Sequence, residues 1–288
     1  MDDTRPISEL LRLCSTYEQE YQDEKGNDMD KNKIVIIMDE KQKENEKEDI
    51  QLETEPNIDQ VEKVLSALPP TLPSTFAMMR FTLEFMEVLF QNWRDPQGYG
   101  KWWSDPIHLK DILSIGNRST NANDFDPIPL SCIGSIYIGA MPIHELNHEN
   151  DLVAMNIKAV VSLNESWELE PFSIPWITSW TPLSFIDYQQ MGITSVYLPT
   201  PDMTNPNLEN ITYGIQCIHT FLKRGENVLI HCKAGRGRSV FLAALSIYEL
   251  FKDIGIFIPI NDIFTFIESV RPQTSLNKRQ TKALFTRE

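Results

Sequence analysis

One segment near the carboxyl end of the chain restricts the fold more than any other. An apolar strand pattern, Val228 to Ile230, runs directly into His231-Cys232-Lys233-Ala234-Gly235-Arg236-Gly237-Arg238-Ser239, and the helical pattern RSVFLAALSIYEL begins within that run. A tight strand–loop–helix turn directs several backbone N–H groups and a helix amino terminus at one point in space. The segment therefore predicts an anion site at the end of a buried strand.

The side chains of this loop suit chemistry on a bound phosphate group. Gly235 and Gly237 allow the backbone to fold tightly around an anion. Arg238 can bind two phosphate oxygens with its planar guanidinium group. The same positive surroundings are expected to lower the pKa of the Cys232 thiol, and a thiolate below a phosphate is a nucleophile for phosphoryl transfer.

Such a transfer also needs a carboxylic acid that protonates the departing alkoxide. Asp202 is the first candidate, because it lies in LPTPDMT (198–204), after a predicted strand and 30 residues before Cys232. The alternative interpretation of Asp202 is an aspartate in a turn before a helix. Asp187 is the next candidate, in a longer connecting segment.

Short apolar runs alternate with helical patterns from about residue 131 onwards. The predicted strands are 136–139, 158–163, 195–198 and 227–230, and the predicted helices are 148–155, 206–224, 238–252, 261–270 and a last one from Leu276. Asn205 is the predicted cap of the second of these helices, with Pro206 at its first position and Gly225 as its stop. The alternation predicts an α/β fold with a central, mostly parallel sheet flanked by helices.

HCKAGRGRS resembles the HC-x5-R-[ST] signature of the cysteine-dependent protein tyrosine and dual-specificity phosphatases. IYIGAMP (136–142), AVVSLNESWE (159–168), LPTPDMTNPNLENI (198–211) and VRPQTSLN (270–277) narrow the resemblance to the phosphatidylglycerophosphate phosphatase branch. Two departures are Val240-Phe241, where the branch has small residues, and Gly237, where it often has Ser.

The resemblance implies hydrolysis of a phosphomonoester through a cysteinyl-phosphate intermediate, with no metal and no cofactor. It implies that Cys232 attacks, that Arg238 and the loop 233–237 hold the phosphoryl group, and that Asp202 supplies the proton. It further implies that the Ser239 hydroxyl helps the thiolate to leave. In the supporting positions, His231 resembles the histidine that tunes the cysteine, and Asn164 and Glu165 either line the cleft or stabilise the loop.

The charges of Lys233 and Arg236 indicate which class of substrate the site binds. A lipid headgroup with a second phosphate rewards additional positive charge, as in phosphoinositide phosphatases, which have basic residues at these positions. The alternative is that both side chains point to solvent. We therefore expect a phospholipid monophosphate such as phosphatidylglycerophosphate. The alternatives are a phosphoprotein, for a dual-specificity enzyme, and a silent phosphate-binding module.

The chain is expected to have three parts: an acidic disordered extension (1–70), a helix with an irregular connector (71–130) and the phosphatase domain (131–288). Residues 1–60 hold 18 acidic and 8 basic residues, and such a segment buries too little apolar surface to fold. The apolar stretch 34–38 inside it is either a transiently sticky spot or a docking motif.

The predicted helix 74–90 carries Arg80, Glu84 and Glu87 on one narrow stripe, with apolar or small residues elsewhere. It can pack in a core, or lie in a membrane interface with the stripe facing water. Peripheral membrane contact through 74–90 is therefore one expectation.

The formal net charge of −15 argues against nucleic acid as a partner. Four widely spaced cysteines disfavour disulfides and zinc and favour a reducing compartment. The pattern of His144 and His148 with their neighbouring glutamates is more typical of solvated residues than of a metal site. Cys217 is more typical of a small core residue than of a redox partner of Cys232. The resemblance implies a mitochondrial location, although MDDTRPISEL is too acidic for a typical presequence. The alternative is a cytoplasmic protein in peripheral contact with a membrane.

Overall fold

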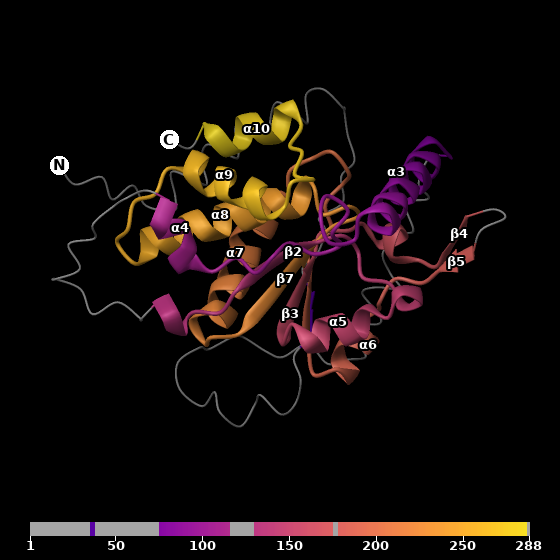
Figure 1. Cartoon of the computed structure of the whole chain (residues 1–288), viewed down its shortest axis with the longest axis horizontal. Coiled ribbons are helices and arrows are strands. Elements are labelled where there is room, and N and C mark those ends of the chain that lie inside the picture. Colours follow the sequence, from indigo (N-terminus) through magenta and orange to yellow (C-terminus); the bar gives the residue numbers. More distant parts are fainter. Residues whose placement is uncertain (1–34, 38–74, 116–129, 175–177, 287–288) are drawn as a thin grey trace.

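The computed structural model describes residues 35–37, 75–115, 130–174 and 178–286 (Figure 1). Its main sheet has five strands in the order β1-β6-β3-β7-β2. The strands β2 (Ile136–Gly139), β3 (Ile157–Ser162), β6 (Thr194–Tyr197) and β7 (Asn227–His231) are parallel to one another. The expected mostly parallel sheet is therefore confirmed.

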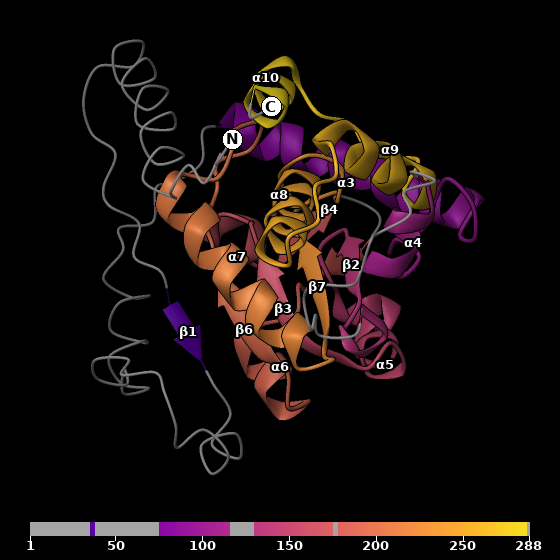
Figure 2. The same ribbon diagram turned by 90° about the vertical axis from the view of Figure 1, so that its left-hand side faces the viewer.

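β1 (Val35–Ile37) is the exception, because it pairs antiparallel with β6 at one edge of the sheet (Figure 2). It comes from the apolar stretch 34–38. The rest of the predicted acidic extension lies outside the described residues.

Helices cover both faces of the sheet (Figure 2). α7 (Leu208–Lys223) and α8 (Arg238–Asp253) cover one face, with α9 (Ile260–Val270) and α10 (Lys278–Phe285) packed on α8. α5 (His148–Ala154) and α6 (Phe185–Gln190) lie on the other face. In β7, Val228 and Ile230 join the core under α7 and α8, whereas Leu229 joins the core under α5 and α6. A strand buried on both faces explains the continuous apolar run in its sequence.

Two predicted helix starts differ from the structure. The helix predicted from Pro206 begins at Leu208, because Asn207 rather than Asn205 is the cap: its side chain accepts the Asn210 N–H at 2.7 Å. The helix predicted from Leu276 begins at Lys278, where Asn277 is the cap. Asn277 also donates to the Met203 carbonyl, next to Asp202 in the sequence.

The predicted helix 74–90 is α3 (Thr75–Arg94). Phe81, Phe85 and Val88 on one side are buried against Trp102 and its neighbours, as the core-packing alternative predicts. The stripe of Arg80, Glu84 and Glu87 does not simply face water, since it contacts residues of the loop that follows β7 and Asp202. Figure 1 shows α3 beyond the carboxyl ends of the strands.

Part of the expected connector 91–130 is regular. Trp103 and Ile107 form isolated antiparallel bridges with Gly139 and Ile136 of β2. α4 (Leu109–Ile115) follows, and its Leu109 and Ile112 are buried in the core. The two bridges and the buried side chains of Leu109 and Ile112 therefore hold this segment beside β2.

The sequence did not predict several short elements. They are α4, α6, the hairpin of β4 (Phe172–Ile174) and β5 (Thr178–Trp180), and the 3-10 helices η2 (Leu130–Cys132), η3 (His144–Leu146) and η4 (Ser166–Leu169). Segments of this length show too few periods of an apolar pattern to be recognised. Among the described residues, no helix combines the length and the apolar character that a membrane crossing requires.

Candidate active site

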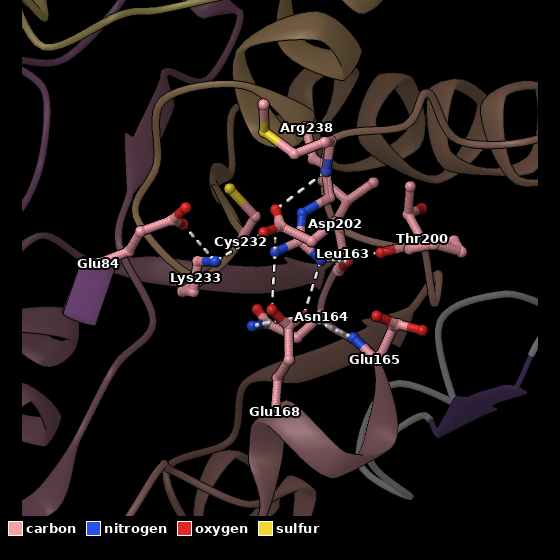
Figure 3. Close-up of polar contacts among 12 residues, drawn as sticks. Glu84, Leu163, Asn164, Glu165, Glu168, Thr200, Asp202, Cys232, Lys233 and Arg238 are labelled. Atoms are coloured by element: carbon pink, nitrogen blue, oxygen red, sulfur yellow. Dashed lines mark hydrogen bonds and ion pairs between the residues drawn. The ribbon is translucent and has the colours of Figure 1, made fainter. Parts of the chain in front are cut away.

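Loops from three parallel strands meet at one edge of the sheet (Figure 3). Cys232 follows β7, Asn164 lies two residues beyond β3, and Asp202 lies in the loop after β6. Ligand sites of open α/β sheets form at the carboxyl ends of the strands, which is where these side chains gather. The site therefore depends on the parallel order of β6, β3 and β7.

Cys232 is the buried residue at the base of the loop. Its Sγ lies 3.4 Å from the Ser239 hydroxyl, at the start of α8. Burial alone would raise the pKa of the thiol, but the charge of Arg238, the Ser239 hydroxyl and the backbone N–H groups of Ser239 and Gly235 outweigh it. The pKa of Cys232 is lowered, as the sequence predicted, and this favours the thiolate.

Arg238 is a fully buried arginine with a fixed orientation. Its guanidinium group forms a bidentate pair with the Glu168 carboxylate at 2.7 and 2.9 Å. It also donates to the carbonyls of Leu163 and Thr200 at 3.2 and 2.8 Å. The pKa of Arg238 is raised, because Glu168 outweighs the effect of burial. Arg238 therefore keeps its charge and its direction without a ligand.

Glu168 is a functional residue that the sequence analysis missed. It is fully buried and accepts hydrogen bonds from the Glu165 backbone N–H at 2.9 Å and the Asn164 amide at 3.3 Å. Glu165 and Glu168 form a capping box around η4. Their spacing of three residues directly after a buried strand is the signal that could have identified Glu168. Asn164 thus holds the partner of Arg238 in place.

Arg271 is a second residue that the sequence analysis did not single out. Its buried guanidinium group donates to the carbonyls of Gly235 and Ala234 at 2.5 and 3.0 Å. Gly235 has φ of +67°, and a Cβ there would lie 2.4 Å from the Gly139 carbonyl carbon. Only glycine fits this turn, and Arg271 holds the carbonyls outward, so the N–H groups of the loop can point inward.

Asp202 lies beside the loop cations. Its carboxylate is 2.7 Å from the Lys233 ammonium, 3.4 Å from the Arg238 guanidinium and 3.7 Å from that of Arg80. Burial would raise the pKa of Asp202, but Arg238 and Lys233 outweigh it and hold the pKa below its usual range. The structure thus places the predicted acid next to the predicted phosphate site.

The start of α10 holds the Asp202 loop. The Asn277 amide donates to the Met203 carbonyl at 2.8 Å, and the Gln280 amide donates to the Thr204 carbonyl at 3.0 Å. The segment 270–277 therefore fixes both loops of the site, one through Arg271 and the other through Asn277.

Lys233 and Arg236 are neither solvated nor free for a second phosphate. The Lys233 ammonium is buried and lies 2.5 Å from the Glu84 carboxylate of α3. Arg236 contacts Glu87 at 3.1 Å and Gln91 at 2.6 Å on the same helix. The sequence analysis considered that these cations bind a second phosphate or point to solvent, and it did not consider their pairing with α3. The orientation of α3 could not be predicted from its apolar pattern.

The central part of the chain matches known phosphatases. Residues 137–249 match the model of a family described as polymorphic toxin system, DSP-PTPase phosphatase. Human phosphatidylglycerophosphatase and protein-tyrosine phosphatase 1 is 30% identical over 120 residues, which cover 41% of this chain and 54% of that protein. The central part of the chain therefore resembles the cysteine-dependent phosphatase superfamily, as its HC-x5-R motif predicts.

Two further similar proteins each match about half of this chain. Phosphatidylglycerophosphate phosphatase PTPMT2 of Arabidopsis thaliana is 26% identical over 151 residues, which cover 52% of this chain and 58% of the relative. A crystal structure of PTPMT1 in complex with PI(5)P aligns with a TM-score of 0.44 and 23% identity, over 52% of this chain and 88% of that chain. The chain spans about half the length of the curated relatives that it matches.

Two predicted residues, His231 and Asp187, form no hydrogen bond or ion pair with Arg238 in the described structure. His231 is buried, and burial lowers its pKa to about 3, so it is neutral. Asp187 accepts hydrogen bonds from Ser184, the cap of α6, and contacts His144, and none of its hydrogen bonds or ion pairs in the described structure involves Cys232 or Arg238.

The sequence analysis also considered a metal site at His144 and His148 and a redox role for Cys217. Within the described residues, no group of three or more His, Cys, Asp or Glu side chains could hold a metal ion. Cys217 packs against the core, and burial raises the pKa of its thiol to about 11.

Glu168→Gln tests the role of the buried ion pair. The variant keeps the shape of the side chain but leaves the Arg238 charge without its partner, which costs about 3–5 kcal/mol of stability in buried pairs. We expect a lower melting temperature together with a lower pKa of Cys232, since the Arg238 charge is then shared with fewer anions. The pH dependence of Cys232 alkylation by iodoacetamide measures that pKa.

Glu170→Gln is the matched control, because Glu170 is exposed in the same segment. It should leave both the melting temperature and the alkylation profile unchanged. A Glu168→Gln variant that is destabilised but alkylates with the profile of the unaltered chain would limit Glu168 to a structural role.

Proposed function

We propose that the chain hydrolyses phosphomonoesters through a cysteinyl-phosphate intermediate on Cys232. One observation carries this proposal: a buried thiol with a lowered pKa lies next to the fixed Arg238 guanidinium and the amino terminus of α8. Those groups fit a phosphate dianion, and the thiolate below it fits the attacking nucleophile.

In the first step the Cys232 thiolate attacks phosphorus, and a sulfur–phosphorus bond forms while the phosphorus–oxygen bond to the leaving group breaks. The leaving oxygen takes a proton from the Asp202 carboxylic acid. In the second step Asp202 accepts a proton from water, and the water oxygen attacks phosphorus. The sulfur leaves as a thiolate that the Ser239 hydroxyl stabilises by hydrogen bonding.

The state of Asp202 must change when substrate binds. In the free protein Lys233 and Arg238 hold its pKa below the usual range, so Asp202 is ionised at neutral pH. A bound phosphate dianion draws the same cations toward itself and places negative charge near the carboxylate. Both effects raise the pKa of Asp202, so the proton enters the site together with the substrate.

Phosphate release in the presence of EDTA tests the proposal. The purified protein is assayed with a small aryl phosphate, phosphatidylglycerophosphate vesicles and a phosphotyrosine peptide. We expect steady turnover of at least one substrate, and only background release by Cys232→Ser, because a hydroxyl at that position has no comparable acidity. No release from any of the three would leave a silent phosphate-binding module.

Asp202→Asn separates proton donation from phosphate binding. We expect kcat/KM for an alkyl phosphate to fall by about 10²–10⁴-fold, the usual contribution of a general acid. An aryl phosphate with an acidic leaving group should lose far less, since its oxygen departs without a proton. The pH profile is the second readout.

In that profile, the activity of the unaltered chain should decline as pH rises and the site loses its proton, and this decline should disappear in Asp202→Asn. Equal losses on both substrates with an unchanged pH profile would assign the proton to another group.

For the substrate we propose a phospholipid monophosphate such as phosphatidylglycerophosphate. The support is the resemblance to relatives whose names specify that activity, over about half of their length. A dual-specificity protein phosphatase is the second candidate, and a specific contact favours it. Lys233 and Arg236 are already paired with α3, so they do not add free positive charge for a second phosphate.

We also propose that α3 makes peripheral contact with a membrane, and by resemblance that this membrane is mitochondrial. Apolar side chains lie exposed along the outer side of α3: Met79, Leu83, Phe90 and Trp93. They recur at helical spacing on one side of the helix. A lipid surface on that side would present headgroups next to the site.

Leu83→Ser with Phe90→Ser tests this contact. Each side chain would lose about 1.5–3 kcal/mol of transfer energy, so vesicle binding should fall at least tenfold. Co-sedimentation with phosphatidylcholine vesicles containing phosphatidylglycerol measures the effect. Phe257→Ser, at an exposed aromatic residue between α8 and α9, is the control. Equal sedimentation of all three proteins would argue against a membrane-binding role of α3, and cell fractionation of the full chain tests the location.

A further inference from the structure

The charged stripe of α3 meets the loop that follows β7. Glu84 lies 2.5 Å from the Lys233 ammonium, and Glu87 lies 3.1 Å from the Arg236 guanidinium. Gln91, one turn further along, accepts from Arg236 at 2.6 Å. Figure 3 shows the Glu84 carboxylate and the Lys233 ammonium pointing toward one another beside Cys232.

These two glutamates contact cations other than the one that holds the scissile phosphate, although Lys233 also contacts Asp202 at 2.7 Å. Arg238 is the cation oriented by Glu168 for the scissile phosphate. Lys233 and Arg236 are further loop cations, and a substrate with a second anionic group would use them. Because Glu84 and Glu87 are neighbours on one helix face, their carboxylates occupy the space beside both cations at once.

The glutamates are held there by the packing of α3. Phe81 and Phe85 on the same helix are buried, and Phe85 makes ring contacts with Trp102 and Phe172. The Lys233 ammonium also lies 5.8 Å from the centre of the Phe81 ring. Burial of Lys233 strengthens its attraction to Glu84, since few water molecules screen the pair.

We propose that Glu84 and Glu87 are specificity-determining residues, which fill a second-anion subsite formed by Lys233 and Arg236. A substrate with one phosphate group finds the site complete. A substrate with a second phosphate or phosphodiester, phosphatidylglycerophosphate included, binds only by displacing one or both carboxylates from the cations, so the two glutamates lower its affinity without excluding it. The proposal rests on the proposed phosphomonoesterase function, and it concerns which substrates that site prefers.

The double variant Glu84→Gln with Glu87→Gln tests the proposal by anion binding. Binding is measured as protection of Cys232 from iodoacetamide, so the readout does not require turnover. The probes are inorganic phosphate and methylenediphosphonate, which carries a second phosphoryl group. We expect half-protection by methylenediphosphonate at about tenfold lower concentration in the double variant, because two charged competitors are removed. Half-protection by phosphate should change less than threefold.

Two further variants make the result specific. Glu209→Gln with Glu268→Gln removes the same charge from exposed positions on α7 and α9 and should leave both concentrations unchanged. Adding Lys233→Met to the first double variant should abolish most of the gain, since the subsite then lacks its buried cation. In turnover, the ratio of kcat/KM for phosphatidylglycerophosphate to that for an aryl phosphate should rise in the double variant.

The outcomes separate this proposal from the proposed function. A double variant in which both probes shift equally, or neither shifts, would overturn the specificity role while aryl phosphate turnover continued to support the phosphatase. Failure of every anion to protect Cys232 in all variants would overturn the phosphate site itself, and the subsite with it.

Discussion

The buried ion pair between Arg238 and Glu168 is the interaction on which the site depends. A charge without water is costly, so a buried arginine needs hydrogen-bond acceptors, and an anionic partner such as the one Arg238 has stabilises it further. Glu168 supplies the partner, and the carbonyls of Leu163 and Thr200 supply acceptors after two neighbouring strands. The guanidinium group is therefore directed before any ligand arrives, and its charge favours the Cys232 thiolate. The same pair ties the loop after β7 to η4, so the electrostatics and the geometry of the site cannot be altered separately.

A second constraint comes from the carboxyl-terminal part of the chain. A loop whose N–H groups converge on an anion must direct its carbonyls elsewhere, and those carbonyls need donors. Arg271 donates to the carbonyls of Gly235 and Ala234, and Asn277 donates to that of Met203 in the acid loop. The supports of the two loops that form the site thus lie only six positions apart in the sequence. The packing of α9 and α10 on α8 therefore also fixes the position of the candidate site.

The sequence predicted the loop 231–239 and the parallel sheet well, because both leave local signals: glycines and cations at fixed spacing, and apolar runs alternating with helices. It did not predict that Glu168 pairs with Arg238, because the two residues are 70 positions apart in the sequence. The residues next to Glu168 in the sequence also resemble an exposed turn. The orientation of α3 was equally hidden, since Phe81 and Leu83 are both apolar and only one of them is buried. Both the pairing of Glu168 and the orientation of α3 depend on contacts between segments that are far apart in the sequence. The catalytic roles of Asp202 and Ser239 stay predictions, and in the structure Asp202 lies beside Lys233 and Arg238 while Ser239 lies beside Cys232.

The three cations within the loop, Lys233, Arg236 and Arg238, each already have a carboxylate beside them. Arg238 has Glu168 and Lys233 has Asp202 and Glu84. Binding of an anionic substrate to such a site is an exchange of anions rather than the filling of a positive pocket. Glu168 is fully buried and also caps η4, whereas Glu84 and Asp202 are partly exposed, so an anion can compete for their cations while Glu168 stays paired with Arg238. Asp202 is one of these partly exposed carboxylates, so the group that must become protonated for catalysis is also the one that substrate separates from its cations. Substrate binding and activation of the acid are then one electrostatic event.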